Sequence, residues 1–381
     1  MNAEDQGGDI ATLLRDSARD FAAGERDHGA MRARAWHPAL PGFDAAAFAQ
    51  MQALGWRGML VAEAQGGAGL GLREAAAVAQ ELGRSLLGEP FVATAVLPVT
   101  ALLHAAVQPQ AGALLGDVAS GAATLALAWQ EQAASIAVDA IRTEARREGN
   151  GFVISGRKGW VAGGAAATAF LVSARIDEGV GVLHVPRDAP GVHVSNTWQT
   201  DGTPSIAVAL DHVAVKADAL MAAPAHGRAV LAQALDAATV AASAELLGVA
   251  HEAFDMTLAY MRTRVQFGQP IGSFQALQHK AVDLLVQREL AAAVLDEALA
   301  AFTDDACTGP ERSRVASRCK ARCSDAALRI TRECIQLHGA IGYTHECDIG
   351  LYLKRALVLS AWLGNAAQHR RRHVELAAAG E

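Results

Sequence analysis

The sequence is poor in aromatic and charged residues. Aromatic side chains make up 5% of the 381 residues and charged side chains 19%, although 51% are hydrophobic, so alanine supplies much of the apolar content. A composition of this kind favours long, closely packed helices. At this length the chain can bury a large core and divide into two or three domains.

The chain also lacks an excess of positive charge, since its formal net charge is -7 at pH 7. Proteins that bind nucleic acids carry a basic stripe, so this composition argues against that class. The segment from Met1 to Arg19 is acidic and polar, rather than a basic stretch followed by an apolar one. We therefore expect no secretory signal and a cytoplasmic location.

One run, from Phe91 to Gly116, contains no Asp, Glu, Lys or Arg. Its length is sufficient to span a bilayer. However, Pro98 and Pro109 interrupt it and His104 adds a polar side chain. We predict a buried pair of helices here and no membrane span.

Cysteine is scarce, and the five cysteines all lie in the last quarter of the chain. Their spacings fit neither a CxxC pair nor a zinc ribbon. A metal site at Cys319 and Cys323 would need His338 or His345 to approach through tertiary structure. We predict reduced thiols with structural roles and no metal site.

The residue pattern changes twice along the chain, which predicts an α+β fold of three parts. We expect an N-terminal α-helical domain over residues 1–120, a middle antiparallel β-domain over 121–224 and a C-terminal four-helix bundle over 225–381. The glycine cluster at 66–69 is expected to connect helices, because no Gly-Lys-Ser/Thr follows it.

The expected elements follow from periodicity and turn residues. The four bundle helices are expected near 227–263, 273–303, 311–338 and 346–376. The β-type runs are expected at 124–129, 134–143, 152–155, 169–174, 181–185 and 206–210.

Two motifs lie between the expected bundle helices. Residues 264–271 read Arg-Val-Gln-Phe-Gly-Gln-Pro-Ile, and residues 336–343 read Gln-Leu-His-Gly-Ala-Ile-Gly-Tyr. Arg264 has two interpretations, as a helix C-cap or as a guanidinium that binds phosphate while Phe267 stacks on a purine. In the second motif, small residues allow backbone N–H groups to approach a diphosphate.

Together these motifs resemble the flavin-holding signatures of the acyl-CoA dehydrogenase family, and the order helical, β, helical resembles that family across nearly the whole chain. The resemblance implies FAD as cofactor, an acyl-CoA substrate and an electron-transfer flavoprotein as acceptor. It also implies a homo- or hetero-tetramer, because each flavin touches two chains. The implied cofactor-binding residues are Trp160, Arg264, Gln266, Phe267, Gln275, Gln336, Gly339, Ala340 and Gly364.

The expected β-domain keeps only part of the family's flavin contacts. Lys158 and Trp160 are present, whereas Ala162 stands where the family commonly has Thr or Ser. The family's Thr-Glu-Pro turn retains only Glu131, and the Gly-Ser-Asp that follows retains at most Ser135.

The family's catalytic base is absent from both of its usual places. The residue before Gly364 is Leu363, and in the Leu-Asp-x-Glu-Arg pattern of the first bundle helix the glutamate has become Ala238. Removal of a weakly acidic α-proton needs a carboxylate within reach. Asp236 and Glu245, on the same expected helix, are the candidate substitutes. Arg370 matches a family arginine that follows the catalytic loop, so the resemblance makes it a candidate to approach a flavin or CoA phosphate, although the run 369–373 is more typical of a solvated helix face.

The leading hypothesis is a subunit of a heteromeric acyl-CoA dehydrogenase that lacks its own glutamate and shares an interface flavin site with a homologous chain. Some such enzymes act on bulky CoA esters such as steroid side chains. The alternatives are a self-sufficient homotetramer with an unrecognised carboxylate base, a flavin-dependent monooxygenase of the same fold, and an assembly protein without flavin.

Overall fold

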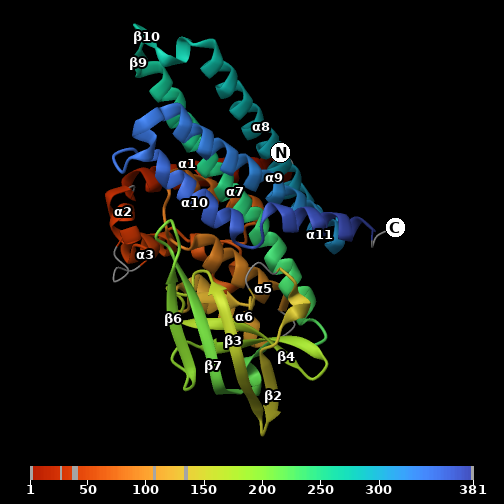
Figure 1. Cartoon of the computed structure of the whole chain (residues 1–381). Coiled ribbons are helices and arrows are strands. Elements are labelled where there is room, and N and C mark those ends of the chain that lie inside the picture. The colour runs from red at the N-terminus through yellow and green to blue at the C-terminus, as the bar shows by residue number, and fades with distance from the viewer. Residues whose placement is uncertain (1–2, 26–27, 37–41, 106–108, 133–135, 379–381) are drawn as a thin grey trace. The chain divides into compact units, whose positions relative to one another are not determined.

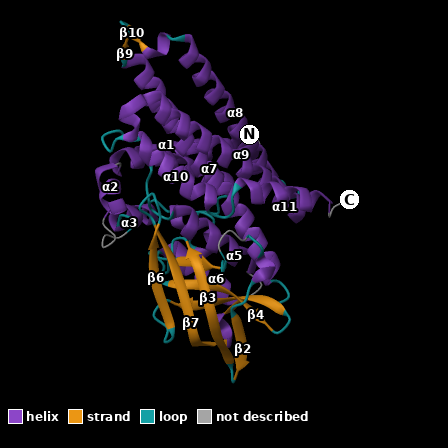
Figure 2. Ribbon diagram, in the orientation of Figure 1, coloured by secondary structure: helices purple, strands orange, loops and turns teal. Residues whose placement is uncertain are grey.

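The computed structural model describes residues 3–25, 28–36, 42–105, 109–132 and 136–378. Helices occupy both ends of the chain and strands its middle, which confirms the predicted α+β fold (Figures 1 and 2). The described helices are α1 (Ala3–Glu25), α2 (His28–Trp36), α3 (Ala45–Ala53), α4 (Leu72–Ser85), α5 (Leu97–Ala105), α6 (Pro109–Ser120), α7 (Gly227–Thr263), α8 (Gln275–Thr303), α9 (Gly309–His338), α10 (Ile349–Ala361) and α11 (Ala366–Ala378).

Ten strands are assigned within the described residues. They are β1 (Leu125–Ala128), β2 (Glu144–Glu148), β3 (Gly151–Val161), β4 (Ala169–Ile176), β5 (Gly179–Pro186), β6 (Val192–Trp198), β7 (Pro204–Lys216), β8 (Leu220–Ala222), β9 (Val265–Gln266) and β10 (Gln269–Pro270).

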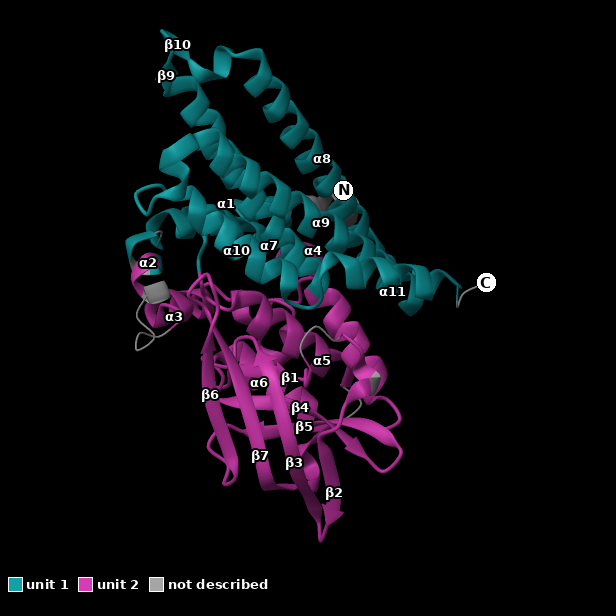
Figure 3. Cartoon of the chain, viewed as in Figure 1, with its two compact units in different colours: residues 1–31, 76–87, 239–381 teal, residues 32–75, 88–238 magenta. Residues whose placement is uncertain are grey.

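The chain folds into two compact units, drawn in different colours in Figure 3. One unit contains residues 1–31, 76–87 and 239–381, and the other contains residues 32–75 and 88–238. Helices α4 and α7 each pass from one unit into the other. The three-part division expected from the sequence stays a prediction, since it follows chain order and the units follow spatial contacts.

In the unit of residues 32–75 and 88–238, the sheet order is β6-β7-β3-β2-β4-β5-β8, with β1 added beside β4. Most described neighbours are antiparallel, as expected, but β1 and β2 both run parallel to β4. The run expected at 134–143 is not a strand where the structure describes it, since 138–140 forms a 3-10 turn. Strands β2 and β6 were missed because most of their side chains are exposed on both faces, which removes the apolar alternation.

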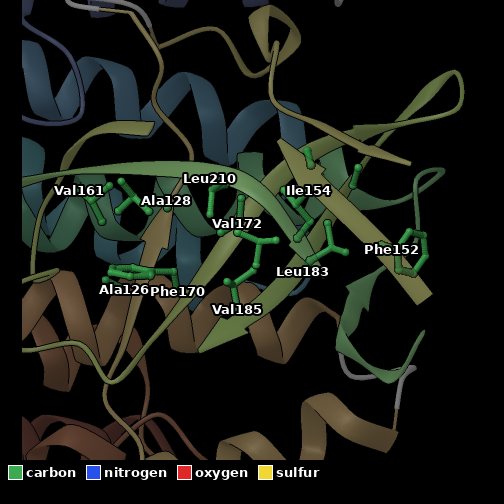
Figure 4. Packing of buried hydrophobic residues seen from close by; sticks show 14 of the residues in the cluster. Ala126, Ala128, Phe152, Ile154, Val161, Phe170, Val172, Leu183, Val185 and Leu210 are labelled. Atoms are coloured by element: carbon green, nitrogen blue, oxygen red, sulfur yellow. The ribbon is translucent and has the colours of Figure 1, made fainter. Parts of the chain in front are cut away.

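One core cluster of this unit consists of apolar side chains of the sheet (Figure 4). Phe170, Val172, Leu183 and Val185 are completely or almost completely buried there. Each such side chain contributes about 1.5–3 kcal/mol when it is fully removed from water. The sheet is therefore held by side-chain burial.

The charge-free run forms the buried helix pair that we predicted. A π-helical turn over Val92–Val96 continues into α5, and α6 packs against α5. Leu97, Leu102 and Leu115 are nearly inaccessible to solvent. The run is thus apolar because it lies inside a helical layer.

In the other unit, α7 is the central helix, and every residue from 241 to 250 is buried. Among the described helices, α7 is long and apolar enough to cross a membrane, but 89% of its most apolar window is buried inside the protein, as expected for a core helix. Close packing against α4 needs glycine, since a Cβ at Gly248 would lie 1.9 Å from the Gln80 carbonyl oxygen. A Cβ at Gly83 would lie 2.3 Å from the carbonyl oxygen of Glu245.

The ends of the other bundle helices follow local sequence signals. Thr308 and Glu311 form a capping box at the start of α9, with Pro310 in the first turn. The fourth expected helix, 346–376, was wrong, because α10 ends at Ala361 and α11 begins at Ala366. Leu363 and Gly364 between them have φ angles of 60° and 103°, which a helix cannot contain.

Candidate flavin and substrate site

The first motif forms a β-hairpin between α7 and α8. Strands β9 and β10 pair through Gln266 and Gln269, and the two residues between them, Phe267 and Gly268, have φ angles of 53° and 80°. Positive φ at both central positions is the geometry of a type I′ turn. The Ile271 N–H donates to the Arg264 carbonyl oxygen at 2.8 Å and closes the base of the hairpin.

The side chains of this hairpin point toward solvent in the single chain. Phe267 is 91% exposed, and Arg264, Gln266 and Gln275 are exposed as well. The Phe267 ring makes an edge contact with Phe274, with 6.1 Å between ring centroids. A guanidinium and a positioned aromatic ring, both accessible, are suited to a phosphate and a purine from another molecule.

The second motif ends α9. Gly339 has a φ of 69°, and a Cβ built on it would meet no atom within 4 Å, so its backbone is open to a ligand. Gly342 differs, since a Cβ there would lie 2.6 Å from the Ile335 carbonyl oxygen. Gln336 and Ala340 are exposed beside them. The glycines therefore supply both close packing and an accessible backbone.

A ring pair that we had not predicted brings the two motifs together. Tyr260, one turn before Arg264 on α7, stacks on His338, the last residue of α9, with 4.5 Å between ring centroids. His338 Nδ1 donates to the Cys334 carbonyl oxygen at 2.8 Å, and burial lowers the pKa of His338. The sequence signal was one ring four residues before the first motif, Tyr260, and one ring inside the second, His338.

The structure places Leu363 in the loop between α10 and α11, where its side chain is only 5% exposed. The carbonyl oxygen of Leu363 accepts a hydrogen bond from His369 Nε2 at 2.9 Å. The Gly364 N–H donates to the Ala361 carbonyl oxygen at 3.2 Å. The loop at the expected base position is therefore ordered by hydrogen bonds, and it contains no carboxylate.

Two buried basic side chains, Lys320 and His369, contact the backbone in or near this loop. The Lys320 ammonium, completely buried, donates to the Leu359 carbonyl oxygen at 2.6 Å near the end of α10. Burial lowers the pKa of Lys320 to about 7. Burial and the charge of Lys320 also lower the pKa of His369 to about 4, so His369 is neutral at pH 7 and carries its proton on Nε2.

The two candidate substitute carboxylates have different environments. Asp236 is buried on the part of α7 that belongs to the unit with the sheet, two residues from buried Ala238. Glu245 belongs to the other unit and forms a buried ion pair with Arg355, whose Nε lies 3.0 Å from Glu245 Oε1. A carboxylate engaged in this way is held in place by α10.

In the sheet unit, the Lys and Glu retained from the family pattern form a buried ion pair. Lys158 Nζ lies 2.7 Å from Glu131 Oε1 and 2.9 Å from Ser173 Oγ. Burial lowers the pKa of Lys158 to about 8. Burial opposes ionisation of Glu131, but Lys158 and the Thr143 amide lower its pKa overall.

The flavin-ring contacts expected at the end of β3 are only partly present. Trp160 is 47% exposed with a φ of 52°. Ala162 beside it offers no hydroxyl group. The expected Ser135 lies outside the described residues.

Comparison with known proteins agrees with this geometry. The sequence matches the models of the N-terminal, middle and C-terminal domains of acyl-CoA dehydrogenase over residues 9–122, 126–213 and 225–375. The structure of the steroid ACAD Tcur3481-Tcur3483, solved as a point variant, is 30% identical, with a TM-score of 0.86 over 98% of this chain and 99% of that one. This chain belongs to the acyl-CoA dehydrogenase family.

Two further relatives extend the comparison. "Probable acyl-CoA dehydrogenase YngJ" of Bacillus subtilis (strain 168) is 28% identical over 94% of this chain and 95% of its own length. A chain of the ChsE4-ChsE5 complex from Mycobacterium tuberculosis is 25% identical, with a TM-score of 0.86 over 97% of each chain. The family consists of oxidoreductases that act on CH–CH groups, and its cofactor is FAD. The open Gly339 backbone and the exposed Arg264 and Phe267 fit that cofactor.

Proposed function

We propose that this chain is the subunit of a heteromeric acyl-CoA dehydrogenase that lacks the catalytic base. In this proposal it contributes Arg264, Phe267 and the α9 end to a flavin site completed by a homologous partner, which supplies the glutamate. The observation that carries the proposal is the coexistence of an exposed dinucleotide motif with Leu363 and Ala238 at the base positions.

The two sets of flavin-binding residues differ in how complete they are, and this supports the division of labour. The set on α7, α8 and α9 is complete and exposed, as a group that reaches into another chain's site must be. The set on the sheet has only Trp160 beside Ala162, with Lys158 and Glu131 committed to each other. We infer that this chain completes its partner's flavin site more fully than it builds its own.

The surface of α8 supports association with another chain. Val282, Leu285, Val286 and Leu290 are between 36% and 56% exposed and fall on one side of the helix. Apolar side chains gathered in this way mark an interaction surface. We assign the partner as a homologous acyl-CoA dehydrogenase chain in a tetramer, in accord with the two names of the ChsE4-ChsE5 complex.

The substrate in this proposal is a CoA thioester, and the name of the steroid ACAD relative favours a bulky acyl group. FAD, when bound, supplies the hydride acceptor for α,β-dehydrogenation. The residues of this chain bind the diphosphate and purine of FAD, while the partner's carboxylate takes the α-proton. We propose an electron-transfer flavoprotein as the electron acceptor.

The deciding experiment is isolation of the complex through a tag on this chain from its native host. Subunit masses and the FAD-to-chain ratio would be measured together. We expect a second acyl-CoA dehydrogenase chain that contains the glutamate, and about half a flavin per chain. A homomer with one FAD per chain and ordinary turnover would overturn the proposal and favour a self-sufficient enzyme that uses Asp236 or Glu245.

A further inference from the structure

A cavity of about 400 Å³ opens between α9 and α11. None of its lining residues belongs to the two dinucleotide motifs or to the loop that holds Leu363. The lining residues are Arg318, Ala321, Arg322, Asp325, Arg370, His373 and Val374.

The charge of this cavity is opposite to that of the whole chain. Three guanidinium groups and one carboxylate line it, although the chain has a net charge of -7. Arg370 forms an exposed ion pair with Asp325, and Arg318 forms one with Glu297 outside the lining. Exposed ion pairs of this kind are weak and exchange partners readily.

Arg322 differs from the other two arginines because its hydrogen-bond partner is neutral. Its Nη2 donates to Gln287 Oε1 at 2.9 Å, and the side chain is half-buried. The guanidinium charge is therefore oriented by an amide, and no carboxylate of the described residues forms an ion pair with it. A guanidinium held in this way is suited to two parallel hydrogen bonds to a phosphate.

The rest of the lining is apolar. Ala321 is buried and Val374 is 65% exposed, and the arginine side chains add their aliphatic stems. Arginine planes also stack on purine rings. The cavity thus combines an anion-binding side with a surface for a flat apolar body, and its volume lies in the range of small-molecule sites.

We propose that this cavity is an accessory site for a phosphate-bearing nucleotide, with the phosphate on Arg322 and Arg370 and the base against Ala321 and Val374. The chemistry is shared by free nucleotide bisphosphates and by the nucleotide end of a CoA ester. This inference does not depend on the proposed division of the flavin site, because it concerns binding to residues of this chain alone.

The test is calorimetric titration of the purified full-length chain with inorganic pyrophosphate, adenosine 3′,5′-bisphosphate, CoA and adenosine. We expect saturable binding of the bisphosphate and CoA, weaker binding of pyrophosphate and little binding of adenosine. CoA that binds as tightly as the bisphosphate would identify the nucleotide as the recognised part of the CoA ester. A bisphosphate preference of more than tenfold over CoA would identify a free nucleotide as the ligand.

Variants locate the site. Arg322→Gln should weaken bisphosphate binding roughly tenfold or more, and Arg322→Lys should weaken it less, since it keeps the charge. Arg329→Gln is the matched control, because Arg329 is an exposed arginine on the same helix outside the cavity. If Arg322→Gln fails to fold, the exposed Arg370→Gln variant tests the same prediction.

Equal weakening by Arg322→Gln and Arg329→Gln would overturn the proposal, because it would show diffuse electrostatic attraction. An absence of saturable binding by all phosphate probes would overturn it as well. Binding of an acidic peptide without binding of the bisphosphate would also contradict it and assign the cavity to a protein partner.

Discussion

Two regions of the C-terminal helical part differ in the functional residues that they carry. At the α7–α8 hairpin and the end of α9, the residues suited to a dinucleotide are present and exposed, and the Tyr260–His338 stack links the two elements. At the α10–α11 loop the backbone is equally ordered, but Leu363 occupies the position where we propose that a base is missing. Under the proposed function, binding chemistry and proton-transfer chemistry are separable, because they reside on different side chains of one scaffold.

The largest effect is expected when a carboxylate is introduced into the α10–α11 loop. Leu363→Glu in the isolated, FAD-supplemented chain should raise acyl-CoA turnover on the order of 10²–10⁴-fold, the contribution of a general base. Leu363→Gln is the control, because it has the same size without basicity. Steady-state turnover with an artificial electron acceptor measures both. If the unchanged chain already turns over substrate as fast as the Leu363→Glu variant, the absence of a carboxylate at position 363 does not limit turnover.

A second experiment asks whether Glu245 is a base or a structural ion pair. Glu245→Gln breaks a buried pair with Arg355 and should lower the free energy of unfolding by about 3–5 kcal/mol. Turnover per folded complex should not change. Urea unfolding and activity of the same preparation separate the two roles. A loss of activity without loss of stability would make Glu245 the catalytic base. The double variant Glu245→Leu/Arg355→Met should recover most of the stability.

A third experiment concerns the ordered loop. In the unfolded chain His369 binds a proton below about pH 6.5, whereas in the folded chain its pKa is about 4. The free energy of unfolding should therefore fall as the pH drops from 6.5 to 4. The lost stability from this group amounts to about 3 kcal/mol. His369→Gln keeps an N–H near the Leu363 carbonyl and should reduce the pH dependence of the unfolding free energy by the contribution of one proton.

Unfolding free energy measured at several pH values between 7 and 4 checks this slope. His251, whose burial also lowers its pKa to about 4, should leave a remaining dependence in the variant. An unchanged slope in His369→Gln would show that His369 is not the group that titrates.

The smallest expected effect is on FAD binding by the α7–α8 hairpin. Arg264→Ala should weaken FAD binding by roughly 10–200-fold in the complex, the contribution of a hydrogen bond to a charged group. Arg262→Ala, an exposed arginine in the last turn of the same helix, is the matched control. Flavin absorbance after gel filtration provides the measurement. Equal losses in both variants would assign the effect to general electrostatics.

Much of this architecture was predictable from local pattern. The helix over 227–263 follows from periodicity and from the break at 268–270, and the end of α9 at His338 follows from Gly339. Strands β4, β5 and β7 follow from apolar runs that are buried in the sheet. Strands β2 and β6 were missed because exposed strands carry no alternation, and their pairing partners lie elsewhere in the chain.

The sequence by itself determined the helical and β regions, the two dinucleotide motifs and the absence of a carboxylate at positions 238 and 363, because these depend on residue type and local spacing. Only the tertiary structure decided that Tyr260 meets His338, that Arg355 holds Glu245, and that His369 and Lys320 fix the ends of the α10–α11 loop. Each of these contacts joins residues on different helices or across a loop. Their formation depends on how buried polar groups find partners during packing, which no local pattern specifies.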